Sequence, residues 1–245
     1  METSTLVALS RQGGLRRQMD IVANNIANMN TTGFKGEDMM FVEHLVKTKG
    51  GDKPAGLKLA YSRDIATLMN TAEGPMESTG NPLDLAISGD GFFVVQTPQG
   101  ERYTRNGRFQ LNEGGQLVNQ AGQAVLSSGG QPFILAPEDK EITISRDGTV
   151  ATNNGTLGKL RVVRFDNPQV LKRVAGGLFS AEGVQPTDVP SPNVAQGMLE
   201  GANVQPIFEM AKMIDIHRTY ESVRNFIERE DERMRTMIRE MGRSA

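Results

Sequence analysis

The sequence predicts an α+β protein in which long N- and C-terminal helices pack as a coiled-coil-like bundle, with a central β-rich domain. Apolar residues follow steps of three and four at both ends of the chain, whereas the middle alternates with a period of two. Glycine-containing turn dipeptides separate the short apolar runs of the middle. The five expected regions are an N-terminal helix with an Asn-rich segment (1–35), a connecting segment (36–78), a β-rich domain (79–185), a linker (186–205) and a C-terminal helix (206–245).

The N-terminal helix is expected over about 4–30. Its apolar residues form one stripe, the N-terminal seam, which consists of Leu15, Met19, Val22, Ile26 and Met29. Steps of three and four place side chains along one face of a helix, where they pack on another helix. Gly13 and Gly14 weaken this helix, and an Asn-rich run ends it at Gly33, which can adopt the left-handed conformation of a helix cap.

The middle of the chain has the pattern of short strands. Leu83, Leu85 and Ile87 alternate with small or polar residues, and a glycine turn then precedes the apolar run 92–95. Further strands are expected at 101–105, 116–119, 141–145 and 160–165. The preceding residues 34–75 have a mixed pattern, with a loop or hinge at 50–54.

The C-terminal helix is expected from Pro206 to about Met241, because proline is tolerated in a first turn. The C-terminal seam consists of Met213, Ile216, Tyr220, Val223, Ile227, Glu230, Met234, Met237 and Met241. A second apolar row, formed by Ile207, Ala211 and Ile214, lies beside it. A helix with two apolar faces is usually covered by more than one neighbour. We therefore expect the terminal helices to pack on each other and on neighbouring copies.

The composition and motifs argue against several functions. A net charge of −2 gives no reason to expect nucleic acid as a partner. The chain has no cysteine and only two histidines, and it lacks the nucleophile-elbow, phosphate-loop and dinucleotide-binding motifs. We therefore expect no enzyme activity, cofactor, metal or small-molecule substrate. The sequence also shows no cleavable signal peptide and no membrane-spanning segment, which taken alone predicts a cytoplasmic protein.

Three asparagines near the end of the first helix have two possible roles. Asn24, Asn25 and Asn28 can cap the helix end, or they can hydrogen-bond across a helix interface and fix its register. The sequence is compatible with both roles.

Three segments carry a resemblance to a known family. Residues 20–35 (DIVANNIANMNTTGFK) resemble the N-terminal signature of the bacterial flagellar rod and hook proteins. Residues 196–204, with the residues that follow to Glu221, resemble the second conserved end of that family, although Gly201-Ala202 replaces the usual serine. Residues 79–87 and 89–93 match its middle part. Within that family, the chain length argues against the small innermost rod proteins and the larger hook protein. The opening residues 6–12 and 15–22 resemble a proximal rod subunit more than a distal one.

The resemblance implies a structural subunit of the flagellar basal body. Paired terminal helices would line the inner tube of the rod, and the β-rich domain would form the outer layer. The implied partners are copies of the chain, other proximal and distal rod subunits, and the flagellar export apparatus, which removes no signal peptide. The implied location is the periplasm-spanning basal body. The expected assembly interface comprises Leu15, Met19, Val22, Asn24, Asn25, Ile26, Asn28, Met29, Gly33, Phe34, Met213, Ile216, Tyr220, Val223 and Ile227.

Three alternatives remain open from the sequence. The chain could be a distal rod subunit of the same family, or a soluble coiled-coil adaptor that binds partner helices without polymerising. It could also be a secreted enzyme with helical arms, which would need a polar pocket in the β-rich domain.

Overall fold

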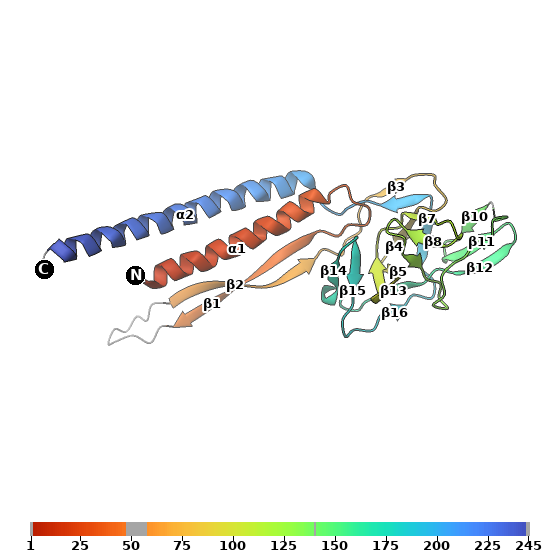
Figure 1. The fold of residues 1–245 in the computed structure, drawn as a ribbon, viewed down its shortest axis with the longest axis horizontal. Coiled ribbons are helices and arrows are strands. Elements are labelled where there is room, and N and C mark those ends of the chain that lie inside the picture. The colour runs from red at the N-terminus through yellow and green to blue at the C-terminus, as the bar shows by residue number, and fades with distance from the viewer. Residues whose placement is uncertain (1, 48–57, 140, 244–245) are drawn as a thin grey trace. The chain divides into compact units, whose positions relative to one another are not determined.

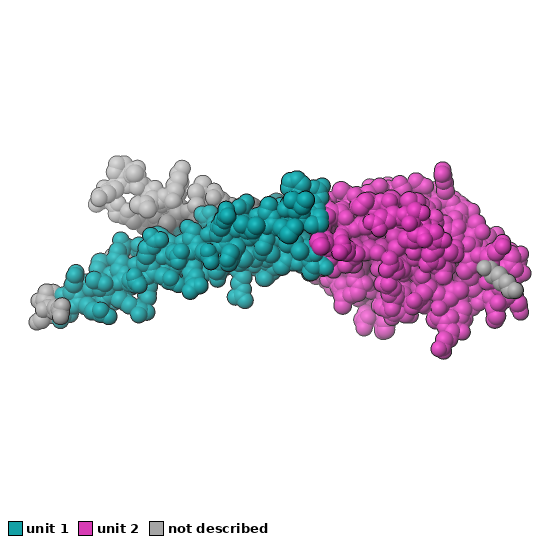
Figure 2. All heavy atoms as spheres, turned by 90° about the horizontal axis from the view of Figure 1, so that it is seen from above, with its two compact units in different colours: residues 1–27, 37–68, 205–245 teal, residues 28–36, 69–204 magenta. Residues whose placement is uncertain are grey.

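The computed structural model describes residues 2–47, 58–139 and 141–243. The chain forms two compact units (Figure 2). Unit 1 comprises residues 1–27, 37–68 and 205–245, and unit 2 comprises residues 28–36 and 69–204. The backbone therefore passes from one unit to the other four times.

Unit 1 contains two helices and a two-stranded sheet. Helix α1 (Glu2–Ala27) and helix α2 (Pro206–Arg243) lie side by side and run in opposite directions (Figure 1). Strands β1 (Glu37–Lys47) and β2 (Lys58–Met69) form the sheet, and β1 contacts α1. The sequence pattern of 34–75 was mixed, and it did not indicate these two long strands. The loop or hinge expected at 50–54 lies outside the described residues.

The expectation of a coiled-coil-like bundle is wrong. The two helices lie far apart in the sequence and flank a large β-rich region, and they form a single pair with a sheet as the third layer. Only Leu15, Val22 and Ile216 of the two seams are buried, and a buried Asn25–Glu209 hydrogen bond takes a place that a coiled coil would fill with apolar side chains. Three-four spacing creates an apolar stripe, but the stripe does not specify that only helices cover it.

Unit 2 is built from short strands. Its largest sheet has the order β14-β15-β6-β5-β9-β8-β7, with β13 paired to β5 and β16 paired to β13. A three-stranded sheet has the order β10-β11-β12, and β17-β4 and β18-β3 form two further pairs. The bounds are β3 (Met76–Ser78), β4 (Leu85–Ser88), β5 (Phe92–Thr97), β6 (Gly100–Thr104), β7 (Phe109–Leu111), β8 (Leu117–Asn119), β9 (Ala124–Val125), β10 (Ile142–Ile144), β11 (Thr149–Thr152), β12 (Gly155–Lys159), β13 (Val162–Arg164), the 3-10 turn η1 (Pro168–Val170), β14 (Lys172–Val174), β15 (Leu178–Ser180), β16 (Thr187–Asp188), β17 (Asn193–Gln196) and β18 (Met198–Glu200).

Strand β5 is the centre of unit 2, because both of its faces are covered. Phe93 and Val95 belong to one apolar cluster, whereas Phe92 and Val94 belong to another. Successive side chains of a strand point to opposite faces, so a continuous apolar run is the pattern of a strand buried on both sides. Edge-to-face ring contacts fix the packing, with Phe93 at 5.2 Å from Phe109 and Phe92 at 5.6 Å from Phe179.

Candidate functional site

The apolar contact between α1 and α2 gathers most of the expected interface residues of unit 1. Leu15, Val22 and Ile216 are buried in one cluster. The partly buried side chains packed against them are Met19, Ile26, Met213, Tyr220 and Val223. Ile227 is half-buried further along α2. The two seams therefore face each other within one chain.

Asn25 links three elements of unit 1. Its side chain is 3% exposed, and its amide nitrogen donates to the Glu37 carbonyl oxygen at 2.8 Å and to Glu209 Oε2 at 3.1 Å. Its amide oxygen accepts from the Glu37 backbone N–H at 3.0 Å. Asn25 thus uses both ends of its amide to connect α1 with α2 and with the start of β1.

The other end of this network is a carboxylate–ammonium pair. Glu209 Oε1 accepts from Lys212 Nζ at 2.9 Å, and Lys212 also donates to Asp38 Oδ1 at 3.0 Å. The hydrogen bond that Lys212 donates to Glu209 is the main cause that raises the pKa of Lys212 above its usual value. The Lys212 ammonium is therefore the positive charge that pairs with the buried Glu209 carboxylate.

The remaining asparagines have local roles or solvent exposure. Asn28 accepts a hydrogen bond from the Thr31 hydroxyl at 3.3 Å, and its carbonyl accepts from the Thr31 N–H at 2.9 Å, in the turn that follows α1. The side chain of Asn24 is exposed. The sequence left capping and cross-interface bonding open. In the structure, Asn28 bonds within the turn and Asn25 bonds across the helices.

The expected interface residues Met29, Gly33 and Phe34 belong to unit 2, whereas the other expected interface residues of the N-terminal segment, except Asn28, belong to unit 1. Gly33 has φ +67°, and a Cβ at this position would lie 2.4 Å from the Arg105 carbonyl carbon. Both the left-handed backbone and the close approach require glycine here. Phe34 is buried, and the Arg173 guanidinium lies 4.3 Å from the centre of its ring.

A buried group of charges lies directly after Phe34 in unit 2. Lys35 Nζ contacts Glu200 Oε1 at 2.6 Å, and the two side chains are 2% and 1% exposed. Arg105, 3% exposed, approaches the other oxygen of Glu200 at 3.6 Å and donates to the carbonyls of Ile87 and Gly89. Burial is the main cause that lowers the pKa of Lys35, and the hydrogen bond to Glu200 opposes this effect.

Sequence reasoning missed this group. Lys35 closes the N-terminal signature and Glu200 lies in the C-terminal stretch, but 165 residues separate them. Spacing along the chain gives no information on a contact at that separation. The one available signal was that the N-terminal signature ends in a lysine, whereas the C-terminal stretch contains a glutamate. Helical and strand periodicity carry no information on such a pair of opposite charges.

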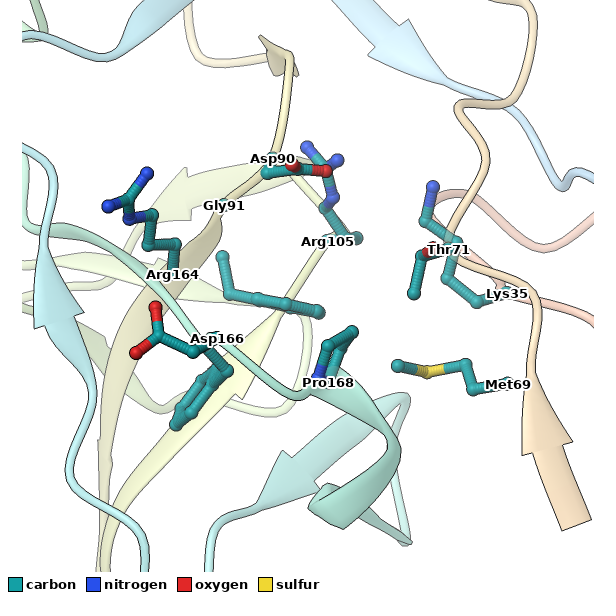
Figure 3. A pocket seen from close by; sticks show the side chains of 11 residues that line it. Lys35, Met69, Thr71, Asp90, Gly91, Arg105, Arg164, Asp166 and Pro168 are labelled. Carbon is teal, nitrogen blue, oxygen red and sulfur yellow. The ribbon is translucent and has the colours of Figure 1, made fainter.

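A pocket of about 150 Å³ lies in unit 2 next to these charges. In Figure 3, Lys35, Met69 and Thr71 line one side, and Arg164 and Asp166 line the other. The Lys35 ammonium and the two Nη groups of Arg105 bind protein oxygens, whereas the buried Arg105 Nε has no hydrogen-bond partner. The lining carries charges of both signs.

Among the described residues, no group of three His, Cys, Asp or Glu side chains could hold a metal ion. None of the described helices combines the length and the apolar character needed to cross a bilayer. His217, which is exposed, lies 3.4 Å from Glu221 one helical turn away.

Helix α2 presents a second apolar face outside the seam. Ile207 is 77% exposed, Phe208 64% and Ile214 53%, whereas Ile216 on the seam is 6% exposed. Further along the helix, Ile238 is 70% exposed. Ile207 and Ile214 are seven residues apart and therefore lie on the same face of α2, whereas Phe208 and Ile238 point in other directions.

Comparison with known proteins matches all three parts of the chain to flagellar families. Residues 6–35 match the model described as flagella basal body rod protein, residues 86–152 match the flagellar hook protein FlgE/F/G D1 domain, and residues 195–240 match the flagellar basal body rod FlgEFG protein C-terminal. The chain is 41% identical over 247 residues to the flagellar basal-body rod protein FlgF of Caulobacter vibrioides, with 99% of each chain covered. It is 35% identical to FlgF of Mesorhizobium japonicum, with 91% and 90% covered, and 34% identical to the rod protein FlgG of Borreliella burgdorferi, with 83% and 85% covered. These matches confirm the resemblance: the chain belongs to the flagellar basal-body rod protein family, as a FlgF-like member.

Proposed function

We propose that this chain is a structural subunit of the proximal part of the flagellar rod, which assembles through its terminal helices and transmits torque. Membership of the rod family already places it in the basal body together with other rod subunits. The match to FlgF proteins over nearly the whole length supports the proximal position. In this function the chain catalyses no reaction and binds no cofactor.

The exposed apolar row of α2 is the observation that carries the proposal. The α1–α2 contact already uses the seam, so α1 does not cover Ile207, Phe208 and Ile214. Covering each large apolar side chain gains roughly 1.5–3 kcal/mol. Neighbouring subunits packed around α2 would supply this gain, because a helix with two apolar faces needs neighbours on both.

We place the assembly interface on the residues expected from the sequence, with the second apolar row of α2 added. The seam residues would act by holding α1 and α2 as a pair, and the row would contact other subunits. Export through the flagellar apparatus, without a cleaved signal peptide, completes the proposal. The periplasm-spanning rod is then the place of work, and the cytoplasm is the place of synthesis.

Incorporation into basal bodies tests the proposal. In a strain that lacks its own copy, Ile214→Gln combined with Ile207→Gln should lower the amount of the chain in purified basal bodies and reduce swimming. Ser222→Gln places the same side chain at an exposed polar position of α2 and should change neither. Removal of residues 206–245 should abolish incorporation. Normal swimming after that deletion would refute the assembly role of α2.

A further inference from the structure

Three segments of unit 2 meet where the chain crosses to unit 1. Residues 28–36 lie between two crossings, residues 69–74 follow the third, and residues 200–204 precede the fourth. Backbone hydrogen bonds join them in pairs: Gly33 N–H to the Glu200 carbonyl at 2.7 Å, and Asn70 N–H to the Gly36 carbonyl at 2.8 Å. The unit-2 ends of all four crossings are therefore tied to one another.

The side chain of Asn203 joins these segments at one point. Its side-chain oxygen accepts from Gly36 N–H at 2.7 Å, and its side-chain nitrogen donates to the carbonyls of Asn70 and Ala72, both at 2.8 Å. Its backbone N–H donates to the Phe34 carbonyl at 3.3 Å. One side chain thus binds two other segments with every hydrogen-bonding group it has.

The ion pair between Glu200 and Lys35 joins the segments at a second point. Lys35 Nζ donates to Glu200 Oε1 at 2.6 Å and to the Ala72 carbonyl at 2.7 Å, and Glu200 Oε1 also accepts from Gly74 N–H at 3.0 Å. A Cβ on Gly74 would lie 2.0 Å from the Gly201 carbonyl oxygen, so the backbones are in direct contact. Loss of one partner of a buried ion pair leaves an uncompensated charge, which is strongly destabilising.

We propose that Lys35, Arg105, Glu200 and Asn203 form a crossing tie, which holds the unit-2 ends of the four chain crossings together as one element and bears load there. The inference rests on the proposed function, because a torque-transmitting subunit must carry load through these crossings. Four untied crossings would each stretch and rotate by backbone rotation alone. Crossings joined by buried hydrogen bonds and ion pairs resist separation together.

The tie also depends on both ends of the chain. The partners of residues 33–36 include residues 200 and 203, so the N-terminal signature completes its hydrogen bonds only after the C-terminal segment has arrived. Amide hydrogen exchange on the full-length chain measures the stability of these hydrogen bonds, because it reports the opening of each segment separately.

The first experiment measures amide exchange in the full-length wild-type chain and in Glu200→Gln and Asn203→Ala. Glu200→Gln keeps the shape of the side chain but leaves Lys35 and Arg105 without a buried counter-ion. Both variants should accelerate exchange in 28–36, 69–74 and 200–204 by at least about tenfold, with β5 unchanged. Glu182→Gln is the matched control, because the Lys172–Glu182 pair has the same 2.6 Å distance but side chains that are 67% and 68% exposed. It should change exchange in none of these segments.

Unchanged exchange in both variants would overturn the tie. An equal acceleration in β5 would also overturn it, since the residues would then stabilise all of unit 2 rather than the crossings. If Glu200→Gln does not fold, Asn203→Ala, which removes no charge, gives the same readout.

The second experiment measures flagellar rotation under load. Cells that carry Asn203→Ala should contain normal amounts of the chain in their basal bodies but should rotate tethered flagella more slowly, or stop, in viscous medium. Wild-type rotation under load, together with accelerated exchange, would overturn the load-bearing role of the tie and leave rod membership intact. Failure of the wild-type chain to enter basal bodies would instead refute the proposed function, so the two outcomes are distinguishable.

Discussion

At the scale of single residues, the segment after α1 requires both a glycine without a side chain and buried polar side chains. Gly33 holds a left-handed backbone against the Arg105 main chain, and Asn25 and Lys35 on either side of it are buried with their polar atoms bonded. Each of these residues has a local environment that only one residue type satisfies. Substitutions here should therefore be costly.

Gly33→Ala should lower the free energy of unfolding by at least about 2 kcal/mol, because it adds left-handed strain and a clash with backbone atoms that cannot move aside. Gly13→Ala is the matched control. Gly13 lies inside α1, and a Cβ there would meet nothing within 4 Å. It should raise the free energy of unfolding by about 0.5–1 kcal/mol, since alanine favours the helix. Urea unfolding followed by circular dichroism measures both, and equal effects would contradict the assignment.

The hydrogen bonds of Asp139 should make the stability of the folded chain depend on pH in the acid range. Hydrogen bonds from Asn154, Thr152 and the Ala136 N–H lower its pKa below 3.8, so the folded state favours the carboxylate. Its stabilising effect is present above pH 3.8 and is lost as the pH falls through the lowered pKa. Asp139→Asn should therefore be less stable than wild type at neutral pH, and the difference should vanish in acid. A difference that is independent of pH in unfolding experiments would exclude this role.

At the scale of elements, α2 has two apolar faces with different partners. Ile216 lies on the seam against α1, and Ile214, two residues away, faces outward. The apolar period of the sequence indicated both rows but did not assign their partners. The structure assigns the seam to the helix pair of the same chain.

Ile216→Ala should cost about 2–5 kcal/mol, because it leaves a cavity among Leu15, Val22 and the side chains around them. Ile214→Ala removes a side chain that is 53% exposed and should cost less than about 1 kcal/mol in the free chain. The loss of helical signal in urea measures both variants. Equal losses would show that the two faces are not distinct.

At the scale of the whole molecule, the two units differ in how far they bury their own side chains. Unit 2 has two apolar clusters with many fully buried members, whereas the helix pair has one small cluster. Stability within a protein follows such local differences, so the helices should open before the sheets. In the assembled rod, neighbouring subunits would remove this difference.

Trypsin should reveal this order in the free chain. Arg224, Arg233 and Arg235 of α2 have side chains that are 64%, 55% and 72% exposed, whereas Arg105 in unit 2 is 3% exposed. Cleavage between Arg224 and Arg239 should precede cleavage at Arg105, as mass spectrometry of timed samples would show. The same sites should resist trypsin in purified basal bodies. Earlier cleavage at Arg105 would contradict the proposed order of opening.

Local pattern was informative where neighbours in the sequence decide the structure. The expected helices at 4–30 and from Pro206 correspond to α1 and α2, and the alternation around Leu85 and the run from Phe92 correspond to β4 and β5. The pattern failed for β1 and β2, whose residues do not alternate cleanly, and for the bundle, whose third layer is a sheet. Of the interface residues, Asn25 bonds both Glu37 and Glu209, and the sequence pattern indicated neither partner.

The sequence by itself determined the helices, many of the strands and the family, because these depend on short-range periodicity and on contiguous signatures. Only the tertiary structure decided that Asn25 bonds Glu209, that Lys35 is paired with Glu200 and that one face of α2 remains uncovered. These features depend on which distant segments meet and on how much water they exclude. A charged residue has the same letter whether it is solvated or buried, and burial alone makes its partner essential.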